Sequence, residues 1–420
     1  MRRASAARVQ FGDPPVTSQA LPVLVIVAPG QGSQTPGMLE PWLELPHFGD
    51  RLDWLSTVSG VDLRTHGTTS DADTIRDTAV AQPLIVGTGL VSLLELFPHP
   101  SDAFRVIAAG AGHSVGEITY AAAAGVLSAE QAMVFVRERG RAMADAAAAA
   151  EPTGMAAVLG GDRDAVLASI AKHGLTAAND NGAGQIVAAG TRAQLDAFQA
   201  DPPEKAKIRP LQVAGAFHTH HMQPAVALLA KHAKAMSTHD PRIGLVSNKD
   251  GQLVSAAHEV LSRLVTQVSG PVRWDLCMQT FGDIGATGIL EIPPAGTLTG
   301  LIKRALPDVE TFALKSPDDL DAARAFVAKH GEKNLLNTQP DWRLVTSPAK
   351  GTIHIGEGLD EGVLLEPQTI VAAVVSLSDE QPVIAEHGGA VIEWLVADGD
   401  PVSPGQPLLR LHPIAEGYGQ

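Results

Sequence analysis

The chain has 420 residues, of which 45% are hydrophobic but only 4% are aromatic. This length predicts about two or three domains, with cores of Val, Leu, Ile and Ala that suit parallel strands buried on both faces. The formal net charge of −15 argues against nucleic-acid binding, because binding phosphates requires a basic surface. The single Cys277 rules out an intramolecular disulfide, and we interpret it as a buried structural residue.

The first segment, residues 1–20, carries three arginines but lacks the apolar core of a secretory signal. We predict that it is a disordered tail. No stretch approaches 18 uninterrupted apolar residues, so we expect no membrane span and no membrane partner. A cytoplasmic location is therefore expected.

Two segments have the order strand, glycine turn, helix. The apolar run 21–28 is followed by a glycine turn at 29–34, and the apolar run 105–109 is followed by Gly110–Glu117 and an alanine-rich helix. This order is typical of an α/β domain with a parallel sheet, which binds ligands at the carboxyl ends of its strands. We predict a hydrolase-like large domain formed by residues 21–153 and 218–331.

The rhythm changes between residues 154 and 217. Strands are predicted near 155–159, 175–178, 185–189 and 208–213, and helices at 163–172 and 192–199. The order β-α-β-β-α-β predicts a ferredoxin-like subdomain. The large domain then resumes with a helix at 224–236 and strands at 244–247 and 288–292.

The last part of the chain is predicted to be a linker at 332–343 and a small all-β domain at 344–420. Its strand-glycine-strand segments and the turn at 398–408 resemble biotinyl and lipoyl domains, which present a lysine at a hairpin tip for cofactor attachment. Here the tip is expected near Ser378 and Asp379, and no lysine follows Lys350. We therefore expect a biotinyl/lipoyl-like β-domain without its attachment lysine and without a cofactor. A β-rich tail with no separate role is the alternative.

The pentapeptide Gly112–Gly116 matches G-x-S-x-G, with Ser114 at its centre. A serine on a sharp turn between strand and helix is exposed as a nucleophile, and the helix N-terminus offers N–H groups to an oxyanion. A plain strand-helix turn is the alternative. The proton acceptor would be a histidine, with His113 inside the motif and His218 further along as candidates.

At this point the sequence resembles one family, the malonyl-coenzyme A:acyl carrier protein transacylases together with the acyltransferase domains of polyketide synthases. The resemblance runs in order over residues 22–315. The segments that carry it are the glycine loop Ala28–Met38, the pair Gln82-Pro83 before a helix, the nucleophile motif Gly112–Glu117, the arginine-bearing helix segment Arg137–Met143, the turn Asn179–Gln185, Ala216–His218, Gln267–Trp274 and the glycine loop Glu291–Gly300.

The resemblance implies a ping-pong mechanism. Ser114 would attack the malonyl thioester while His218 accepts its proton. Backbone N–H groups of Gln31 and Val115 would hold the oxyanion, and the backbone carbonyl of Gln267 would orient the histidine.

The resemblance also implies the substrate contacts. Arg139 would bind the malonyl carboxylate, although without the family it would be interpreted as a solvated helix residue. Phe217 and Val115 are similar to the malonyl-selective form rather than the methylmalonyl one. Asn181 and Gln185 are candidates for substrate contact or for fixing a turn, and His113 is a further candidate for substrate contact.

The implied function is malonyl transfer from malonyl-CoA to an acyl carrier protein in fatty-acid or polyketide biosynthesis, without a metal or a cofactor. A transacylase of a malonate decarboxylase system, an acyl hydrolase and an idle scaffold are the alternatives. An acidic carrier protein would need a basic surface, for which Arg192, Lys205, Lys207 and Arg209 are candidates.

Overall fold

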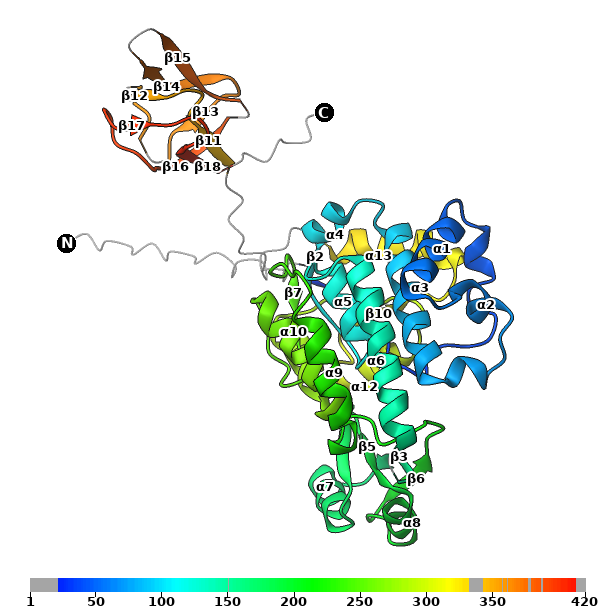
Figure 1. Ribbon diagram of the computed structural model, residues 1–420. Coiled ribbons are helices and arrows are strands. Elements are labelled where there is room, and N and C mark those ends of the chain that lie inside the picture. Colours follow the sequence, from blue (N-terminus) through cyan, green and yellow to red (C-terminus); the bar gives the residue numbers. More distant parts are fainter. Residues whose placement is uncertain are drawn as a thin grey trace, which may run out of the picture. The chain divides into compact units, whose positions relative to one another are not determined.

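The computed structural model describes residues 22–149, 151–331, 343–356, 358–360, 362–376, 379–386 and 388–412. The chain divides into two compact units, residues 1–337 and 338–420 (Figure 1). The predicted tail at 1–20 lies outside the described residues, and so do residues 332–342 of the predicted linker. Each unit is described by itself.

The first unit is built on a five-stranded parallel sheet with the order β10-β9-β1-β2-β7. Its strands are β1 (Leu24–Ala28), β2 (Ile107–Gly112), β7 (Gly244–Leu245), β9 (Gly288–Glu291) and β10 (Glu310–Ala313). The central strands β1 and β2 are buried along their whole length, which explains their continuous apolar runs.

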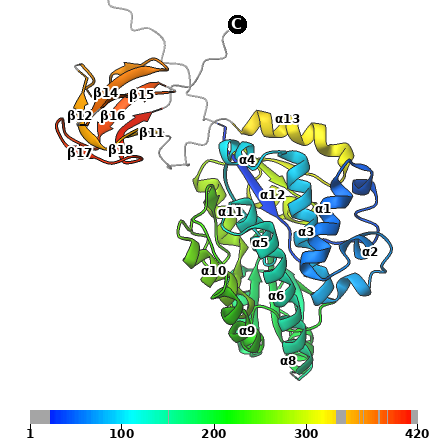
Figure 2. The same ribbon diagram turned by 45° about the horizontal axis from the view of Figure 1, so that its top comes forward.

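Helices cover both faces of this sheet. Successive side chains of a strand point to opposite faces, so alternate residues of β1 pack in two different cores. Leu24 and Ile26 pack in one cluster, whereas Val25 and Val27 pack in another. The helices are α1 (Phe48–Ser59), α2 (Leu63–Thr68), α3 (Thr78–Leu96), α4 (Pro100–Val106), α5 (Gly116–Ala123), α6 (Ala129–Ala149), α9 (Gln223–Ala233), α10 (Ala257–Thr266), α11 (Trp274–Asp283), α12 (Thr297–Ala305) and α13 (Leu320–His330) (Figure 2). Short 3-10 turns are η1 (Pro41–Glu44), η2 (Thr74–Arg76), η3 (His220–Met222), η4 (Gln267–Ser269) and η5 (Pro317–Asp319).

Two local expectations were wrong. The strand expected from residue 105 begins only at Ile107, because Arg105 and Val106 end helix α4, which has a proline in its first turn. Gln82-Pro83, expected before a helix, lies inside α3. Pro83 is the sixth residue of α3, beyond the first turn, so the helix lacks one backbone N–H donor at this position.

Helix α3 is long and apolar enough to cross a membrane by composition alone, and it is the one such helix among the described residues. In the fold, 72% of its 18-residue apolar window is buried. It packs extensively against α6, α5 and α1, and a buried core helix meets the same criterion of length and composition.

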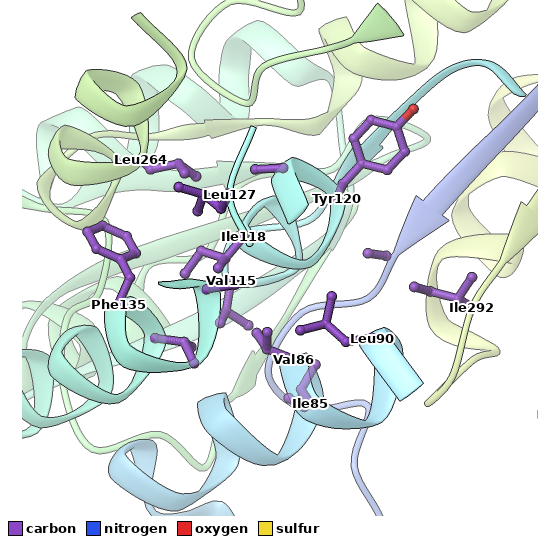
Figure 3. Packing of buried hydrophobic residues seen from close by; sticks show 14 of the residues in the cluster. Ile85, Val86, Leu90, Val115, Ile118, Tyr120, Leu127, Phe135, Leu264 and Ile292 are labelled. Carbon is purple, nitrogen blue, oxygen red and sulfur yellow. The ribbon is translucent and has the colours of Figure 1, made fainter. Parts of the chain in front are cut away.

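The core around α5 fixes the turn that carries Ser114. Val115 and Ile118 lie among Ile85 and Val86 of α3, Phe135 of α6 and Leu264 of α10 (Figure 3). Val115 and Ile118 are both fully buried. The first residue after the candidate nucleophile is therefore locked by packing.

Residues 153–210 together with residues 272–273 form a second sheet with the order β6-β3-β5-β4-β8. Its strands are β3 (Thr153–Gly160), β4 (Thr176–Asp180), β5 (Gln185–Thr191), β6 (Ala206–Pro210) and β8 (Val272–Arg273), and its helices are α7 (Arg163–Lys172) and α8 (Arg192–Ala200). The first four strands are antiparallel neighbours, in the strand order of a split β-α-β fold. The predicted limits of 154 and 217 stay predictions.

The two faces of this second sheet serve different purposes. Ala156 and Val158 of β3 pack in a small core with residues of α7 and α8. Met155, the neighbour on the other face, belongs to the large core and lines the pocket around Ser114. The subdomain therefore contributes one wall of that pocket.

The second unit holds two four-stranded antiparallel sheets with the orders β11-β18-β16-β13 and β15-β14-β12-β17. The strands are β11 (Arg343–Thr346), β12 (Gly351–Ile355), β13 (Leu364–Leu365), β14 (Thr369–Val375), β15 (Glu380–Ala385), β16 (Gly389–Trp394), β17 (Pro401–Val402) and β18 (Pro407–His412). They enclose a small core of their own, with Ile353, Val371 and Leu408 fully buried. Strands β14 and β15 form a hairpin whose ends are joined by Ser376 and Asp379, and Ser378 lies outside the described residues.

Candidate active site

Ser114 lies on the turn between β2 and α5, with a φ of 53°, which is a strained conformation for a residue other than glycine. The two flanking glycines allow the close approach that this turn needs. A Cβ on Gly112 would lie 1.8 Å from the carbonyl carbon of Gly116, and a Cβ on Gly116 would lie 2.3 Å from the oxygen of Ala28. The turn holds the serine hydroxyl at the N-terminus of α5, as a nucleophile elbow does.

The fold brings Ser114 and His218 together although 104 positions separate them. Oγ of Ser114 lies 2.8 Å from Nε2 of His218. On the other side of the ring, Nδ1 donates to the backbone oxygen of Gln267 at 2.8 Å. Because Nδ1 carries the proton, Nε2 is left as the acceptor for the serine hydroxyl.

The surroundings of His218 keep its imidazole neutral. Burial is the largest cause and the positive charge of Arg139 adds to it, so that the pKa of His218 is lowered to about 3, against the smaller opposite effect of its bond to Gln267. A histidine that is neutral near pH 7 can accept a proton. The arrangement therefore has a candidate nucleophile, a candidate base and a group that can orient the base.

Arg139 is a buried cation on α6 beside this pair. Its side chain is 1% exposed, and burial lowers its pKa to about 10. One Nη donates to Oε1 of Gln82 at 2.7 Å, and the other donates to Oε1 of Gln267 at 2.8 Å and lies 3.3 Å from Ser114 Oγ. Its Nε has no hydrogen-bond partner among the described residues. A buried guanidinium whose described hydrogen-bond acceptors, two amide oxygens and a hydroxyl, are all neutral is suited to receive an anion.

Behind these residues lies a polar network that the sequence analysis did not assign. The side chain of Gln267 accepts from Arg139 and donates to Oε2 of Glu117. The other carboxylate oxygen of Glu117 accepts from the backbone N–H of Asn248 at 2.9 Å. Glu117 and Asn248 are both buried. The signal for Glu117 was its place in the nucleophile motif, and that for Asn248 its place just after β7, at the carboxyl edge of the sheet.

The two residues predicted to form an oxyanion hole are both close to Ser114. Gln31 follows β1 in a turn and lines the same pocket as Ser114, and Val115 follows Ser114 directly. The described contacts give neither of their backbone N–H groups an acceptor. The side chain of Gln31 is occupied elsewhere, since its Nε2 lies 3.3 Å from the backbone oxygen of Arg76.

Ser114 and His218 open into a cavity of about 290 Å³. Phe217, Asn181, Gln185 and His113 all contribute to its lining. Nε2 of His113 lies 2.8 Å from Oδ1 of Asn181, and the ring of His113 packs edge-on against Trp274. The contact between His113 and Asn181 therefore fixes both side chains in the wall of the cavity.

A larger cavity of about 520 Å³ lies elsewhere, among α1, α3, α4 and α5. Its lining is mostly aliphatic and aromatic and contains no serine, cysteine or histidine. The smaller cavity is the candidate active site, because Ser114 and His218 both line it. The described residues contain no group of three or more side chains suited to hold a metal ion.

Comparison with known proteins agrees with this geometry. Residues 25–335 match the family described as acyl transferase domain. The malonyl CoA-acyl carrier protein transacylase of Mycobacterium tuberculosis (strain H37Rv) is 49% identical over 304 residues, which cover 71% of this chain and 98% of the relative. That of Mycolicibacterium smegmatis is 51% identical over 288 residues, which cover 68% and 98%.

Solved structures give the same result. The crystal structure of the M. tuberculosis enzyme has a TM-score of 0.69 at 48% identity and covers 72% of this chain and 99% of its own. A malonyl-transacylase in complex with a type II polyketide acyl carrier protein has a TM-score of 0.66 at 27% identity, with coverage of 72% and 99%. The family match ends at residue 335, so the second unit lies outside it. This chain belongs to the acyl transferase family and, within it, to the malonyl CoA-acyl carrier protein transacylases.

Proposed function

We propose that this chain transfers a malonyl group from malonyl-CoA to the pantetheine thiol of an acyl carrier protein, through an ester on Ser114. The observation that carries the proposal is the 2.8 Å contact between Ser114 Oγ and His218 Nε2, with the buried cation Arg139 3.3 Å from the same oxygen. The relatives named above are malonyl CoA-acyl carrier protein transacylases. None of them is named as a hydrolase or as part of a malonate decarboxylase.

In the first half-reaction, Oγ of Ser114 bonds to the thioester carbonyl carbon while its proton passes to Nε2 of His218. The N–H groups of Gln31 and Val115 stabilise the oxyanion, and removing one such donor typically costs about 10²–10³ in rate. Collapse of the tetrahedral intermediate breaks the carbon–sulfur bond. The imidazolium then gives its proton to the leaving coenzyme A thiolate.

The second half-reaction reverses these steps with a different thiol. The pantetheine thiol of the carrier gives its proton to Nε2 of His218, and its sulfur attacks the ester carbonyl. Oγ of Ser114 leaves and takes the proton back. The bond from Nδ1 to Gln267 keeps the ring in the required tautomer throughout.

Arg139 provides selection for malonyl. A malonyl carboxylate would receive charge-assisted, bidentate hydrogen bonds from the guanidinium, which is otherwise held by the amide oxygens of Gln82 and Gln267. The Nε group without a partner supports this assignment, since buried donors normally have an acceptor. Phe217 lines the cavity and limits the room for an additional methyl group. This should favour malonyl over methylmalonyl by about 1–3 kcal/mol, the usual value of one methyl group in an apolar pocket.

For the second unit we propose a biotinyl/lipoyl-like β-domain that carries no amide-linked cofactor. Two antiparallel sheets around one core and the hairpin β14–β15 support this proposal, and the chain has no lysine after Lys350. We also propose a hydrolase-like large domain, because Ser114 lies on a turn of the nucleophile-elbow type.

The test of the activity is intact-mass analysis after mixing the protein with malonyl-CoA or acetyl-CoA. We expect a malonyl adduct on the wild type, no adduct on Ser114→Ala, and loss of the preference for malonyl in Arg139→Ala. Addition of a carrier protein with its pantetheine arm should discharge the adduct onto the carrier. Equal labelling of the wild type by both thioesters contradicts the role of Arg139, and discharge to water at the same rate with and without carrier indicates a hydrolase.

A further inference from the structure

Glu117 is a buried carboxylate inside the site for which the reaction above has no use. Its side chain is 2% exposed and lies on α5, three residues after the nucleophile. Burying a carboxylate is costly unless it is paired and hydrogen-bonded. Its direct hydrogen-bond donors are the Asn248 backbone and the side chains of Ser247 and Gln267, and all three are neutral.

The nearest opposite charge is Arg139, which Glu117 meets through the amide of Gln267. A carboxylate only accepts hydrogen bonds, so Gln267 presents Nε2 to Glu117 and therefore Oε1 to Arg139. Burial raises the pKa of Glu117 and lowers that of Arg139, and the attraction between the two charges opposes both shifts. The carboxylate, the amide and the guanidinium form one relay with no net charge.

A malonyl group adds a second carboxylate to this relay, whereas an acetyl group adds none. Two carboxylates that share one buried cation do not both stay ionised, and the pKa of one of them rises. The malonyl carboxylate would take the direct hydrogen bonds of the guanidinium. Glu117 is one amide further away and is the group that gives up its charge.

We propose, on the basis of the malonyl transfer proposed above, that Glu117 takes up a proton when the malonyl ester forms on Ser114 and releases it when the malonyl group leaves. Glu117 is then a positioning residue that adjusts the charge of the site to a carboxylated acyl group. The sulfur of Cys277 on α11 also contacts this network, because it accepts a hydrogen bond from the side chain of Asn248. Burial raises the pKa of this thiol well above its ordinary value, so it stays neutral. His218, beyond Gln267, is already neutral because of its lowered pKa.

In the free protein, the pKa of Glu117 lies in the range where a nearby charge changes its protonation. Burial is the largest cause of a shift that raises the pKa of Glu117 to about 7, against the opposing hydrogen bonds and Arg139. Near and above pH 7 the free site therefore holds an ionised Glu117 in a substantial fraction of molecules. By linkage, loading with malonyl relative to acetyl should fall by up to about tenfold per pH unit as the pH rises above the pKa of the free site.

The experiment measures proton uptake in weakly buffered solution at pH 7.5 to 8 with a pH indicator, while the wild-type protein is loaded from malonyl-CoA or acetyl-CoA. Both reactions release the same thiol, so its ionisation cancels in the comparison, and intact mass gives the amount of ester. We expect proton uptake that approaches one proton per malonyl ester, and none beyond the thiol correction for the acetyl ester. Glu117→Gln should remove the difference, whereas Glu95→Gln, which removes a carboxylate paired with Arg51 away from the site, should keep it.

The outcomes separate the two proposals. Absence of a malonyl adduct on wild-type Ser114 contradicts the proposed function. A full malonyl adduct with the same proton balance as the acetyl adduct overturns the role of Glu117 and leaves the transfer reaction intact. The comparison of two thioesters on one wild-type protein does not depend on whether Glu117→Gln folds.

Discussion

The side chain of Asn248 holds the backbone on both sides of Ser114. Its Oδ1 accepts from the backbone N–H of Ser114 at 2.8 Å, and its Nδ2 donates to the backbone oxygen of Gly112 at 2.8 Å. These bonds stabilise a turn in which Ser114 has a positive φ. Asn248 is fully buried, so the amide has no competing water.

Asn248→Ala is therefore expected to impair catalysis through the geometry of the turn. The variant leaves a buried N–H and a buried carbonyl without partners, which costs about 1–3 kcal/mol for each such group. We expect a lower midpoint of denaturation and a malonylation rate reduced by about 10² or more, the usual result of displaced reacting groups. Thermal denaturation and single-turnover intact-mass kinetics check the two effects. A variant that loses stability but keeps its single-turnover rate would show that the turn keeps its geometry without the Asn248 side chain.

Arg139→Lys should lose activity selectively for malonyl-CoA. A lysine keeps the charge but cannot form the planar bidentate contact with a carboxylate, nor can it reach Gln82 and Gln267 with the geometry of two Nη groups. We expect kcat/KM for malonyl-CoA to fall by about 10–10², equivalent to one or two charge-assisted hydrogen bonds, and that for acetyl-CoA to change much less. Parallel kinetics with the two substrates check this. An equal decrease of kcat/KM for both substrates would mean that Arg139 maintains the structure of the site and does not select the malonyl group.

The strands and helices around the site could be predicted because their patterns are local. The runs at β1 and β2 and the helix α7 follow from apolar periodicity and turn residues. The polar network behind the site could not be predicted in this way, because Glu117 and Asn248 are 131 positions apart and both residue types usually lie at the surface. Arg139 shows the same limit, since its sequence context alone is that of a solvated helix residue. Only the family resemblance indicated a role for it, and its burial became visible in the fold.

We expect an acidic carrier protein to contact the basic residues of the edge strand β6. Lys207 and Arg209 are exposed and two residues apart, so they lie on one face of the strand. The chain continues from β6 into Leu211 and Val213, which line the cavity of Ser114. We expect Lys207→Glu/Arg209→Glu to slow discharge onto the carrier by about tenfold at low salt, with a smaller effect at high salt, and to leave loading from malonyl-CoA unchanged. The matched control is Arg324→Glu/Lys329→Glu on α13, and an equal effect of this control would indicate a response to net charge alone.

Among the described residues, Arg76 is the one lysine or arginine that lines both the cavity of Ser114 and the adjoining groove beside Leu211 and Val213. Its side chain is 39% exposed and forms an ion pair with the exposed Asp73, a pair of little energetic value. We expect it to bind a phosphate of the pantetheine-bearing substrates. Arg76→Ala should raise KM for malonyl-CoA by about tenfold, the value of one charge-assisted hydrogen bond, and should not affect a malonyl thioester that lacks phosphate. An equal increase for both thioesters would contradict a phosphate contact.

His218 and Glu117 should have opposite effects on the pH dependence of stability. Their ordinary pKa values are 6.5 and 4.5, whereas in the fold they are about 3 and about 7. Between pH 4.5 and 6.5 the unfolded chain therefore binds a proton on His218 that the native protein lacks, and the native protein binds one on Glu117 that the unfolded chain lacks. The two contributions to the slope of the free energy of unfolding against pH cancel. In Glu117→Gln only the histidine remains, so the free energy of unfolding should rise by about 1.4 kcal/mol per pH unit relative to the wild type. In His218→Asn it should fall by the same amount. Urea denaturation of the three proteins at several pH values measures these slopes, and parallel curves would mean that neither group has a shifted pKa in the native protein.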